Sequence, residues 1–387
     1  MKNLKKLLYL LQLEEYQTDL YFGWLQKHPL QELQERKNKL RWSLRAILTL
    51  IISLPLIPLL GNQKAIGFGN NLLIPIFRFF EEVFVFLAKT KLKFHPNLIK
   101  IIITGSYGKT TFKEMLAWVL QAKYSILKTP GNVNTRLGIA KVILQRLKKH
   151  HQILIAEAGA YKMGEIRAIC QLVQPSFGII TIIGWMHLER FKTLTNIQKT
   201  KLELVPFIKD ETKLFLPSKN HQFIDFETTV AKIAKQLGIS SKTVKLQLKT
   251  FSPPEHRLVE KKINNNLIIL DNSYNSNPLG FQRSLKRLSR YQNFQKIVVT
   301  PGMIELGNKQ FILNKQLAEK AAKIADIFVI VGQTNRKALT QGVQSAKKNR
   351  SKIIYLKKEE NLDRKLSSIL RPPTVILLEN ELPDHYF

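Results

Sequence analysis

Residues 99–111 read Ile-Lys-Ile-Ile-Ile-Thr-Gly-Ser-Tyr-Gly-Lys-Thr-Thr, and this stretch decides the fold. A run of β-branched residues stops at the first of two glycines, and an amphipathic segment from Phe112 to Ala122 follows. This order predicts a buried strand, a tight loop and a helix. In such a loop Gly105 and Gly108 let backbone N–H groups turn towards an anion, and the helix directs its N-terminal dipole at the same place.

The loop carries residue types that bind nucleotide phosphates and a magnesium ion. Lys109 adds a positive charge, and the hydroxyl of Thr110 is suited to coordinate Mg²⁺. We therefore predict ATP and Mg²⁺ as cofactors. The alternative is an ordinary turn between a strand and a helix, because the spacing is tighter than in the commonest phosphate loop. The predicted nucleotide-binding residues of the loop are Gly105, Ser106, Gly108, Lys109, Thr110 and Thr111.

The composition favours anionic partners. The chain has 387 residues, enough for two or three domains, and its 61 basic and 28 acidic residues give a formal net charge of +33. Such a balance favours nucleotides, nucleic acid or acidic lipid. We expect no nucleic acid, because the basic residues are spread along the whole chain and no basic face carries interleaved aromatic residues. Cys170 is the one cysteine, which excludes an internal disulfide and fits a reducing compartment.

The first 95 residues have the pattern of a membrane anchor. Residues 1–41 read as an amphipathic helix, and residues 46–60 are almost purely apolar. As a helix the apolar run reaches only about 22 Å, less than the roughly 30 Å of a bilayer's hydrocarbon core. A second apolar stretch, residues 72–88, contains Glu81 as well as Arg78 and Glu82, and the last two have the i,i+4 spacing of an ion pair.

The distribution of charge favours a hairpin over a single crossing. ATP is cytosolic, so we expect the chain after residue 95 on the cytoplasmic face of the cell membrane. A single crossing would leave the basic first 45 residues outside, against the positive-inside rule. We therefore predict a membrane hairpin or re-entrant anchor that turns at residues 61–70. The alternative is a buried helical subdomain of a soluble protein.

The rest of the chain alternates predicted strands and helices, which indicates α/β architecture. We expect a helical segment at 1–97, an ATP-binding domain with a parallel sheet at 98–252, and a second, Rossmann-like α/β domain at 253–387. One predicted strand of the first domain ends at Glu157, and another is followed by His187. Because the carboxyl ends of parallel strands carry the site, these side chains are expected to converge on Lys109.

Seven short motifs occur in the order found in the Mur ligase family, and the chain most resembles its MurF branch. The resemblance covers about residues 98–387, and seven motifs in one order are far more specific than any single one. They are the loop at 104–111, with Tyr107 where asparagine is common; T-P-G-N-x-N at 129–134; E-x-G-A followed by G-E-I at 157–166; I-G-x-x-H-L-E at 183–189; Arg257 in a G-R-L-E position; D-D-x-Y-N-A-N-P at 271–278; and L-G-D-M-L-E-L-G at 301–307.

The resemblance implies the Mur ligase fold and an ATP-dependent ligase of peptidoglycan precursor synthesis. The branch joins D-alanyl-D-alanine to a UDP-muramoyl tripeptide through an acyl phosphate. The implied partners are a muramoyl-peptide precursor and an amino acid or dipeptide amine, and we expect a monomer.

The same resemblance implies roles for individual residues. Taken alone, a histidine after a strand or a lysine on a helix is more often structural, so these roles depend on the order of the motifs. The implied catalytic residues are Lys109, His187 and Lys201, with Lys201 carbamylated. The implied metal-facing residues are Thr110, Glu157, His187 and Lys201. Arg257, Asp271 and Asn275 would reach the nucleotide.

Three departures from the family pattern leave the substrates open. The membrane-like segment stands where the family has a uridine-nucleotide domain, and the central domain is short and contains no H-N-x-x-N-A segment. The third departure is residues 377–384, which stand where the family has a K-G-S-R type segment. Within the motif at 271–278, Asn272 takes the place of the second aspartate. Two alternatives therefore remain: a ligase that acts on a lipid-linked wall precursor, and a non-catalytic nucleotide-binding scaffold at the membrane.

Overall fold

A computed structural model of the protein describes residues 2–35, 39–186, 188–217, 224–346, 351–357, 360, 362–367 and 369–386. The chain forms two compact units. One unit takes the chain up to Val83 together with the segment that begins at Leu382, and the other is Phe84–Glu381. The division into segments 1–97, 98–252 and 253–387 remains a prediction.

The N-terminal unit is built from short helices. They are α1 (Lys2–Leu13), α2 (Thr18–Lys27), the 3₁₀ turn η1 (Leu30–Glu32), α3 (Leu44–Ser53), the 3₁₀ turn η2 (Leu54–Leu56) and the first part of α4 (Ile57–Lys93). Leucines of α1 form its core, with Leu7 and Leu11 fully buried. The single helix expected over residues 1–41 is wrong. Glu15 and Tyr16 adopt positive φ angles of 52° and 60°, and left-handed residues cannot continue a right-handed helix.

Helix α4 remains helical through residues 62–70, so only the first residue of the predicted turn at 61–70 lies at a break in the helix. Within α4 the non-helical residue is Gly61, with φ 72° and ψ 162°. Asn70 lies buried in the helix, where its side-chain oxygen accepts hydrogen bonds of 2.9 and 3.2 Å from Arg45. A Cβ on Gly69 would lie 2.3 Å from a serine hydroxyl of α3. This glycine therefore serves close packing of α4 against α3, and the turn itself lies earlier, at η2 and Gly61.

The segment that follows Leu382 completes the core of the same unit. The hydroxyl of Tyr9 donates to Oδ2 of Asp384 at 2.7 Å across 375 positions of sequence. The indole N–H of Trp24 donates to the backbone oxygen of His385 at 2.8 Å. The N-terminal unit is therefore discontinuous in sequence.

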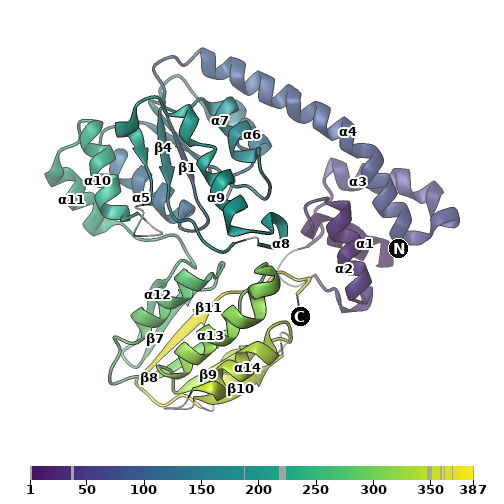
Figure 1. Ribbon diagram of the computed structural model, residues 1–387, viewed down its shortest axis with the longest axis vertical. Coiled ribbons are helices and arrows are strands. Elements are labelled where there is room, and N and C mark those ends of the chain that lie inside the picture. The colour runs from purple at the N-terminus through teal and green to yellow at the C-terminus, as the bar shows by residue number, and fades with distance from the viewer. Residues whose placement is uncertain are drawn as a thin grey trace. The chain divides into compact units, whose positions relative to one another are not determined.

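A parallel five-stranded sheet forms the first half of the larger unit (Figure 1). Its strands are β1 (Ile99–Thr104), β2 (Ile126–Lys128), β3 (Ile153–Glu157), β4 (Phe177–Ile180) and β5 (Leu214–Phe215), in the order β2-β3-β1-β4-β5. The predicted parallel sheet is confirmed. Strand β1 lies in the middle, where a continuous apolar run suits a strand covered on both faces.

Helices cover both faces of this sheet. Ile101 and Ile103 of β1 pack in the core that contains α5, α10 and α11, while Ile102 packs in the core that contains α6, α7 and the end of α4. Alternate residues of a strand point to opposite faces, which explains this division. The helices and 3₁₀ turns are α5 (Lys109–Leu120), α6 (Arg136–Arg146), α7 (Glu165–Val173), α8 (Leu188–Phe191), α9 (Leu194–Leu202), η3 (Val205–Phe207), η4 (Glu211–Lys213), α10 (Phe226–Gln236) and α11 (Ser241–Thr250).

A second, six-stranded sheet forms the other half of this unit, and it confirms the predicted second α/β domain. The order is β10-β9-β8-β11-β7-β6, and neighbours are parallel except for β6 and β7. The strands are β6 (Val259–Asn264), β7 (Leu267–Asn272), β8 (Gln295–Thr300), β9 (Ile327–Val331), β10 (Lys352–Leu356) and β11 (Thr374–Glu379). The helices and 3₁₀ turn are α12 (Pro278–Leu288), η5 (Gly307–Lys309), α13 (Gln310–Ala322), α14 (Arg336–Ser345) and α15 (Leu362–Ser367).

Strand register brings polar residues of each sheet to the carboxyl ends of its strands. In the first sheet Ile103 of β1 pairs with Glu157 of β3, so Glu157 lies beside the start of the loop that follows Thr104. In the second sheet Glu379 of β11 pairs with Asn272 of β7. Both pairs lie at the carboxyl ends of parallel strands, where ligands bind in open α/β sheets.

Candidate functional site

One pocket of the larger unit gathers most of the predicted site residues. Its volume is about 170 Å³. Nine predicted residues line it: Gly105, Ser106, Gly108, Lys109, Thr110, Glu157, Lys201, Arg257 and Asn275. The lining also includes Tyr107, Asn132, Asn134, Gly159, Ala160, Tyr161, Met186, Phe191, Ile197, Tyr274, Ser276 and Asn277. Thr111 and Asp271 are not among the lining residues, and His187 lies outside the described residues.

The phosphate-type loop has the backbone geometry that only glycine adopts easily. Gly105 has φ 141°, and a Cβ there would lie 2.2 Å from the hydroxyl of Thr181. Gly108 has φ 77° and is the N-cap residue of α5. The ammonium of Lys109 folds back over the loop and donates to the carbonyl oxygen of Gly105 at 3.0 Å. Burial lowers the pKa of Lys109, and the nearby Glu157 charge opposes that shift. An anion in the pocket would satisfy this ammonium better than a carbonyl does.

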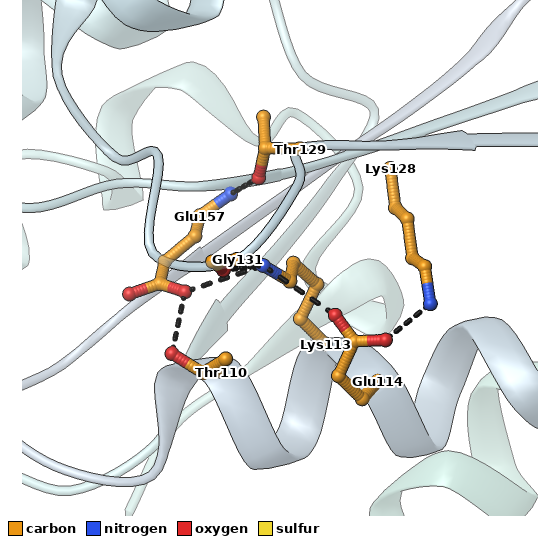
Figure 2. Close-up of polar contacts among 7 residues, drawn as sticks. All are labelled: Thr110, Lys113, Glu114, Lys128, Thr129, Gly131 and Glu157. Atoms are coloured by element: carbon orange, nitrogen blue, oxygen red, sulfur yellow. Dashed lines mark hydrogen bonds and ion pairs between the residues drawn. The ribbon is translucent and has the colours of Figure 1, made fainter. Parts of the chain in front are cut away.

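Glu157 is buried at the end of β3 and points its carboxylate at α5 (Figure 2). The hydroxyl of Thr110 donates to Oε2 of Glu157 at 2.8 Å, and the hydroxyl of Thr129 accepts from the Glu157 backbone N–H at 3.2 Å. Among the described residues, no group of three or more His, Cys, Asp or Glu side chains is placed to hold a metal ion. A hydroxyl and a carboxylate nevertheless fit Mg²⁺, because this ion usually takes one or two protein oxygens and completes its shell with phosphate and water.

Lys201 is a buried lysine on the pocket wall. Its side chain leaves α9 with 3% of the residue exposed, and its ammonium lies 5.8 Å from the ring centroid of Phe191. Burial lowers the pKa of Lys201 to about 7, the charge of Lys109 adds to the shift, and Glu165, Glu203 and Glu157 oppose it. A substantial fraction of neutral amine is therefore present near neutral pH, and a neutral amine is a nucleophile.

The second sheet contributes an aromatic and cationic wall. The guanidinium of Arg257 stacks on the ring of Tyr274 at 4.0 Å from the centroid. Asp271 lies three residues before Tyr274. Its Oδ2 accepts from the Lys261 ammonium at 2.7 Å, and its Oδ1 accepts from the Ser273 hydroxyl at 2.7 Å. Burial alone would raise the pKa of Asp271, but these hydrogen bonds hold it down to about 2. Asp271 thus anchors the loop that bears Tyr274.

The buried carboxylate of Glu379 holds the same loop through hydrogen bonds. Glu379 is fully buried at the end of β11, and the amide of Asn272 donates to both of its oxygens at 3.0 Å. The hydroxyl of Ser276 also donates to Glu379, and the backbone N–H of Ser276 donates to Oδ1 of Asn380 at 3.1 Å. Burial raises the pKa of Glu379 to about 7, although the hydrogen bonds from Ser276 and Asn272 oppose the shift.

Sequence reasoning missed several residues of this site. Glu379 was noted only as a departure from a family motif, and the pocket residues Tyr161 and Phe191 were not singled out. Lys113, which contacts Glu157, was also missed. Its position one helical turn after Lys109 was the available signal, because a lysine on the apolar face of a helix is unusual.

Comparisons with known proteins agree with this geometry. The sequence pattern of the Mur ligase middle domain matches residues 103–299, just over half of the chain. The UDP-N-acetylmuramoyl-tripeptide–D-alanyl-D-alanine ligase of Treponema pallidum is 35% identical over 131 residues, which cover 34% of this chain and 28% of that protein. The enzyme of the same name from Buchnera aphidicola subsp. Acyrthosiphon pisum is 25% identical over 280 residues, which cover 57% of this chain and 61% of that protein. The matches therefore span less than two thirds of these relatives.

A solved structure shows the same fold. The MurF ligase of Thermotoga maritima, crystallised in complex with ADP, superposes with a TM-score of 0.66 at 22% identity. The match covers 78% of this chain and 80% of that one. This likeness supports the arrangement of the two sheets described above.

Glu379 generates a prediction about stability. Its pKa is about 7 in the folded protein against an ordinary 4.5, so the folded state binds the proton more tightly than the unfolded state. The stabilisation is fully present below about pH 4.5 and is lost as pH rises through about 7, and over that whole range it amounts to about 3–4 kcal/mol. Denaturant unfolding at pH 5 and pH 8 should show this loss for the wild type relative to Glu379→Gln. The exposed Glu227→Gln is the control, and equal pH dependence of all three proteins would contradict the assignment.

Proposed function

The chain belongs to the Mur ligase family, and from this membership we propose that it is an ATP-dependent ligase of peptidoglycan precursor synthesis. The relatives' names and the ADP-bound neighbour support the reaction class. The observation that carries the proposal is the pocket itself, which unites the phosphate loop, the Thr110–Glu157 pair and the buried Lys201. Together these groups can bind phosphate, hold a cation and place a further charged side chain beside it, which suits phosphoryl transfer to a carboxylate.

Phosphoryl transfer depends on alignment and charge neutralisation more than on covalent chemistry by the protein. In the proposed reaction, the loop amides and Lys109 bind the β- and γ-phosphates. A substrate carboxylate oxygen attacks the γ-phosphorus, and the bond to ADP breaks. An amine then attacks the acyl carbon, phosphate departs with its bonding electron pair, and the amine loses a proton as the amide forms. Mg²⁺, when bound, would neutralise phosphate charge, and Thr110 and Glu157 would hold it.

Lys201 is proposed to act as a carbamate. Its neutral amine can attack dissolved CO₂ to form a carbamate and release a proton, which changes the side chain from a cation to an anion. The lowered pKa of about 7 supports this step, because only the unprotonated amine reacts. An anionic Lys201 would face the bound cation, whereas an ammonium would repel it. His187, for which the same metal-facing role is proposed, lies outside the described residues.

The proposed substrates are a muramoyl-peptide carboxylate and an amino acid or dipeptide amine, with D-alanyl-D-alanine the amine named for the relatives. Two alternatives stay open: a lipid-linked wall precursor as the carboxylate substrate, and a non-catalytic nucleotide-binding scaffold. The Arg257–Tyr274 wall and the Ser276–Asn277 loop lie where the second substrate would meet the phosphate, and they present donors to an anionic precursor.

A contact with the cytoplasmic face of an anionic membrane is the second part of the proposal. By length and composition, one helical segment of the described chain, Leu44–Lys93, is apolar enough to cross a membrane, and little of its apolar window is buried. Exposed apolar side chains recur along one face of α4, at Leu72, Ile76, Phe79 and Phe86.

The dimensions favour a re-entrant or interfacial anchor. Helix α3 has 10 residues and reaches only about 15 Å, half of the hydrocarbon core. The chain then turns at η2 and Gly61 and returns as α4, so both flanks stay on one side. The net charge of +33 complements anionic headgroups.

Lys109→Ala should lower ATP turnover by at least about a hundredfold, because one positive clamp on the transferred phosphoryl group is lost. The exposed Lys242→Ala is the matched control. Turnover should be measured with a soluble UDP-muramoyl tripeptide and with a lipid-linked muramoyl peptide in parallel, each with D-alanyl-D-alanine. The substrate that supports turnover identifies the precursor. Nucleotide binding without turnover on either one would favour the scaffold.

Lys201→Ala should lose most activity and recover part of it in acetate, because a short carboxylate can occupy the vacated space. Lys201→Arg should not recover, since arginine stays cationic and fills the site. Lys199→Ala, on the same helix but exposed, is the control. Wild-type activity should also fall in CO₂-free buffer. Full activity in that buffer, with no rescue by acetate, would exclude the carbamate.

The full-length protein should float with vesicles that contain phosphatidylglycerol and should resist release by 1 M salt, at which exposed charges are screened within about 3 Å. Phe79→Glu should reduce flotation, because Phe79 is 66% exposed on the apolar face of α4. Phe311→Glu, at a position 43% exposed on α13, is the matched control. Release of the wild type by salt alone would indicate a purely electrostatic contact.

A further inference from the structure

We propose that Lys113 is a positioning residue of the ligase: it holds the Glu157 carboxylate turned towards the bound cation. The inference rests on the proposed function. It concerns a side chain that lies outside the pocket lining and has no role in the phosphate loop itself.

Lys113 is a fully buried lysine on α5, one helical turn after Lys109. Its ammonium lies 3.6 Å from Oε2 of Glu157 and 3.6 Å from Oε1 of Glu114, and it donates to the carbonyl oxygen of Gly131 at 2.5 Å (Figure 2). Three elements therefore meet at one nitrogen: helix α5, the turn after β2, and the end of β3.

Packing alone does not explain this residue. The neighbouring inward positions of α5, Phe112 and Leu116, are apolar and fully buried, and a buried ammonium costs several kcal/mol before its partners compensate. Replacing a buried ion pair with apolar residues is often neutral or stabilising. A lysine at this position is best explained by what it does to Glu157.

The contacts orient the Glu157 carboxylate. The Thr110 hydroxyl and the Lys113 ammonium both contact Oε2. Figure 2 shows the other oxygen pointing away from both donors. Two contacts on one oxygen fix the plane of the carboxylate and leave the second oxygen for a cation. Removing the ammonium would leave Oε2 with the Thr110 hydroxyl alone, so that the plane of the carboxylate would no longer be fixed.

The same ammonium fixes the turn that helps to line the pocket. Gly131 belongs to the turn between β2 and α6, and Asn132 and Asn134 of this turn line the pocket. The turn is also fixed at Thr129, whose hydroxyl accepts from the Glu157 backbone N–H. Lys113 thus holds the turn and the carboxylate in one geometry.

A second, more exposed ion pair adjoins Lys113 and Glu157. Glu114 contacts Lys113 on one side and pairs with Lys128 on the other. The side chain of Lys128 is 43% exposed, against 0% for Lys113. The cluster therefore pairs two cations with two carboxylates, and Lys128 provides a control that breaks an ion pair of the cluster without contacting Glu157.

Calorimetric titration of ADP with and without Mg²⁺ tests the proposal on the full-length protein. Lys113→Met should raise the Mg²⁺ concentration needed for half-maximal ADP binding by about ten- to a hundredfold, the usual effect of losing a residue that supports a metal ligand. The affinity of Lys113→Met for ADP without Mg²⁺ should stay within about twofold of the wild-type affinity. Lys128→Met should match the wild type in both measurements.

Two further variants keep the test decisive. Lys113→Gln retains a donor for the Gly131 carbonyl oxygen but lacks the charge. It should show the same rise in the Mg²⁺ concentration needed for ADP binding, and it replaces Lys113→Met in the test if that variant does not fold. In a Glu157→Gln background, Lys113→Gln should add less than about twofold, because Lys113 acts through Glu157.

The outcomes separate the two proposals. Equal loss of ADP affinity with and without Mg²⁺, or additive effects in the double variant, would overturn the role of Lys113. An unchanged Mg²⁺ requirement in both single variants would do the same. If the ADP affinity of the wild type does not depend on Mg²⁺, the result would instead contradict the proposed function.

Discussion

The pocket depends on the buried carboxylate of Glu157. The parallel register of β1 and β3 places Glu157 beside the phosphate loop, and a charged group buried there is costly unless donors compensate. Helix α5 supplies this compensation through Thr110 and Lys113. The helix that presents the phosphate loop therefore also stabilises the group beside it, so that loop, helix and strand cannot be altered independently.

Local sequence was enough to predict the phosphate loop and the alternation of strands and helices, because Gly105, Gly108 and Lys109 act within a few residues of one another. The roles of Lys113 and Glu379 depend on partners far along the chain, at Glu157 and at Asn272. The apolar face of α5 marks Lys113 as unusual, but no local pattern identifies the partner of either residue. The roles given to Thr111 and Asp271 came from motif position, and the structure places Asp271 beneath the loop, bonded to Lys261.

The N-terminal unit shows how tertiary packing overrides turn signals. Residues 61–70 contain three glycines and three asparagines or glutamines, a composition that favours a turn. Gly69 instead allows α3 to pack closely against α4. Asn70 lies within α4 and accepts a hydrogen bond from Arg45. Apolar composition predicted a membrane anchor over this segment, and the helix bounds show that α3, with 10 residues, is too short to cross a bilayer.

The discontinuous N-terminal unit has a consequence for biosynthesis. Tyr9 and Trp24 find their hydrogen-bond partners at Asp384 and His385, which are among the last described residues to leave the ribosome. Helices α1 and α2 emerge first but cannot complete their packing until translation has passed those positions. The first sheet, whose last strand ends at Phe215, can fold in the meantime, whereas the second sheet waits for its internal strand β11 (Thr374–Glu379). The nascent chain therefore displays its apolar helices throughout elongation, when a membrane surface or a chaperone can bind them before the native core closes.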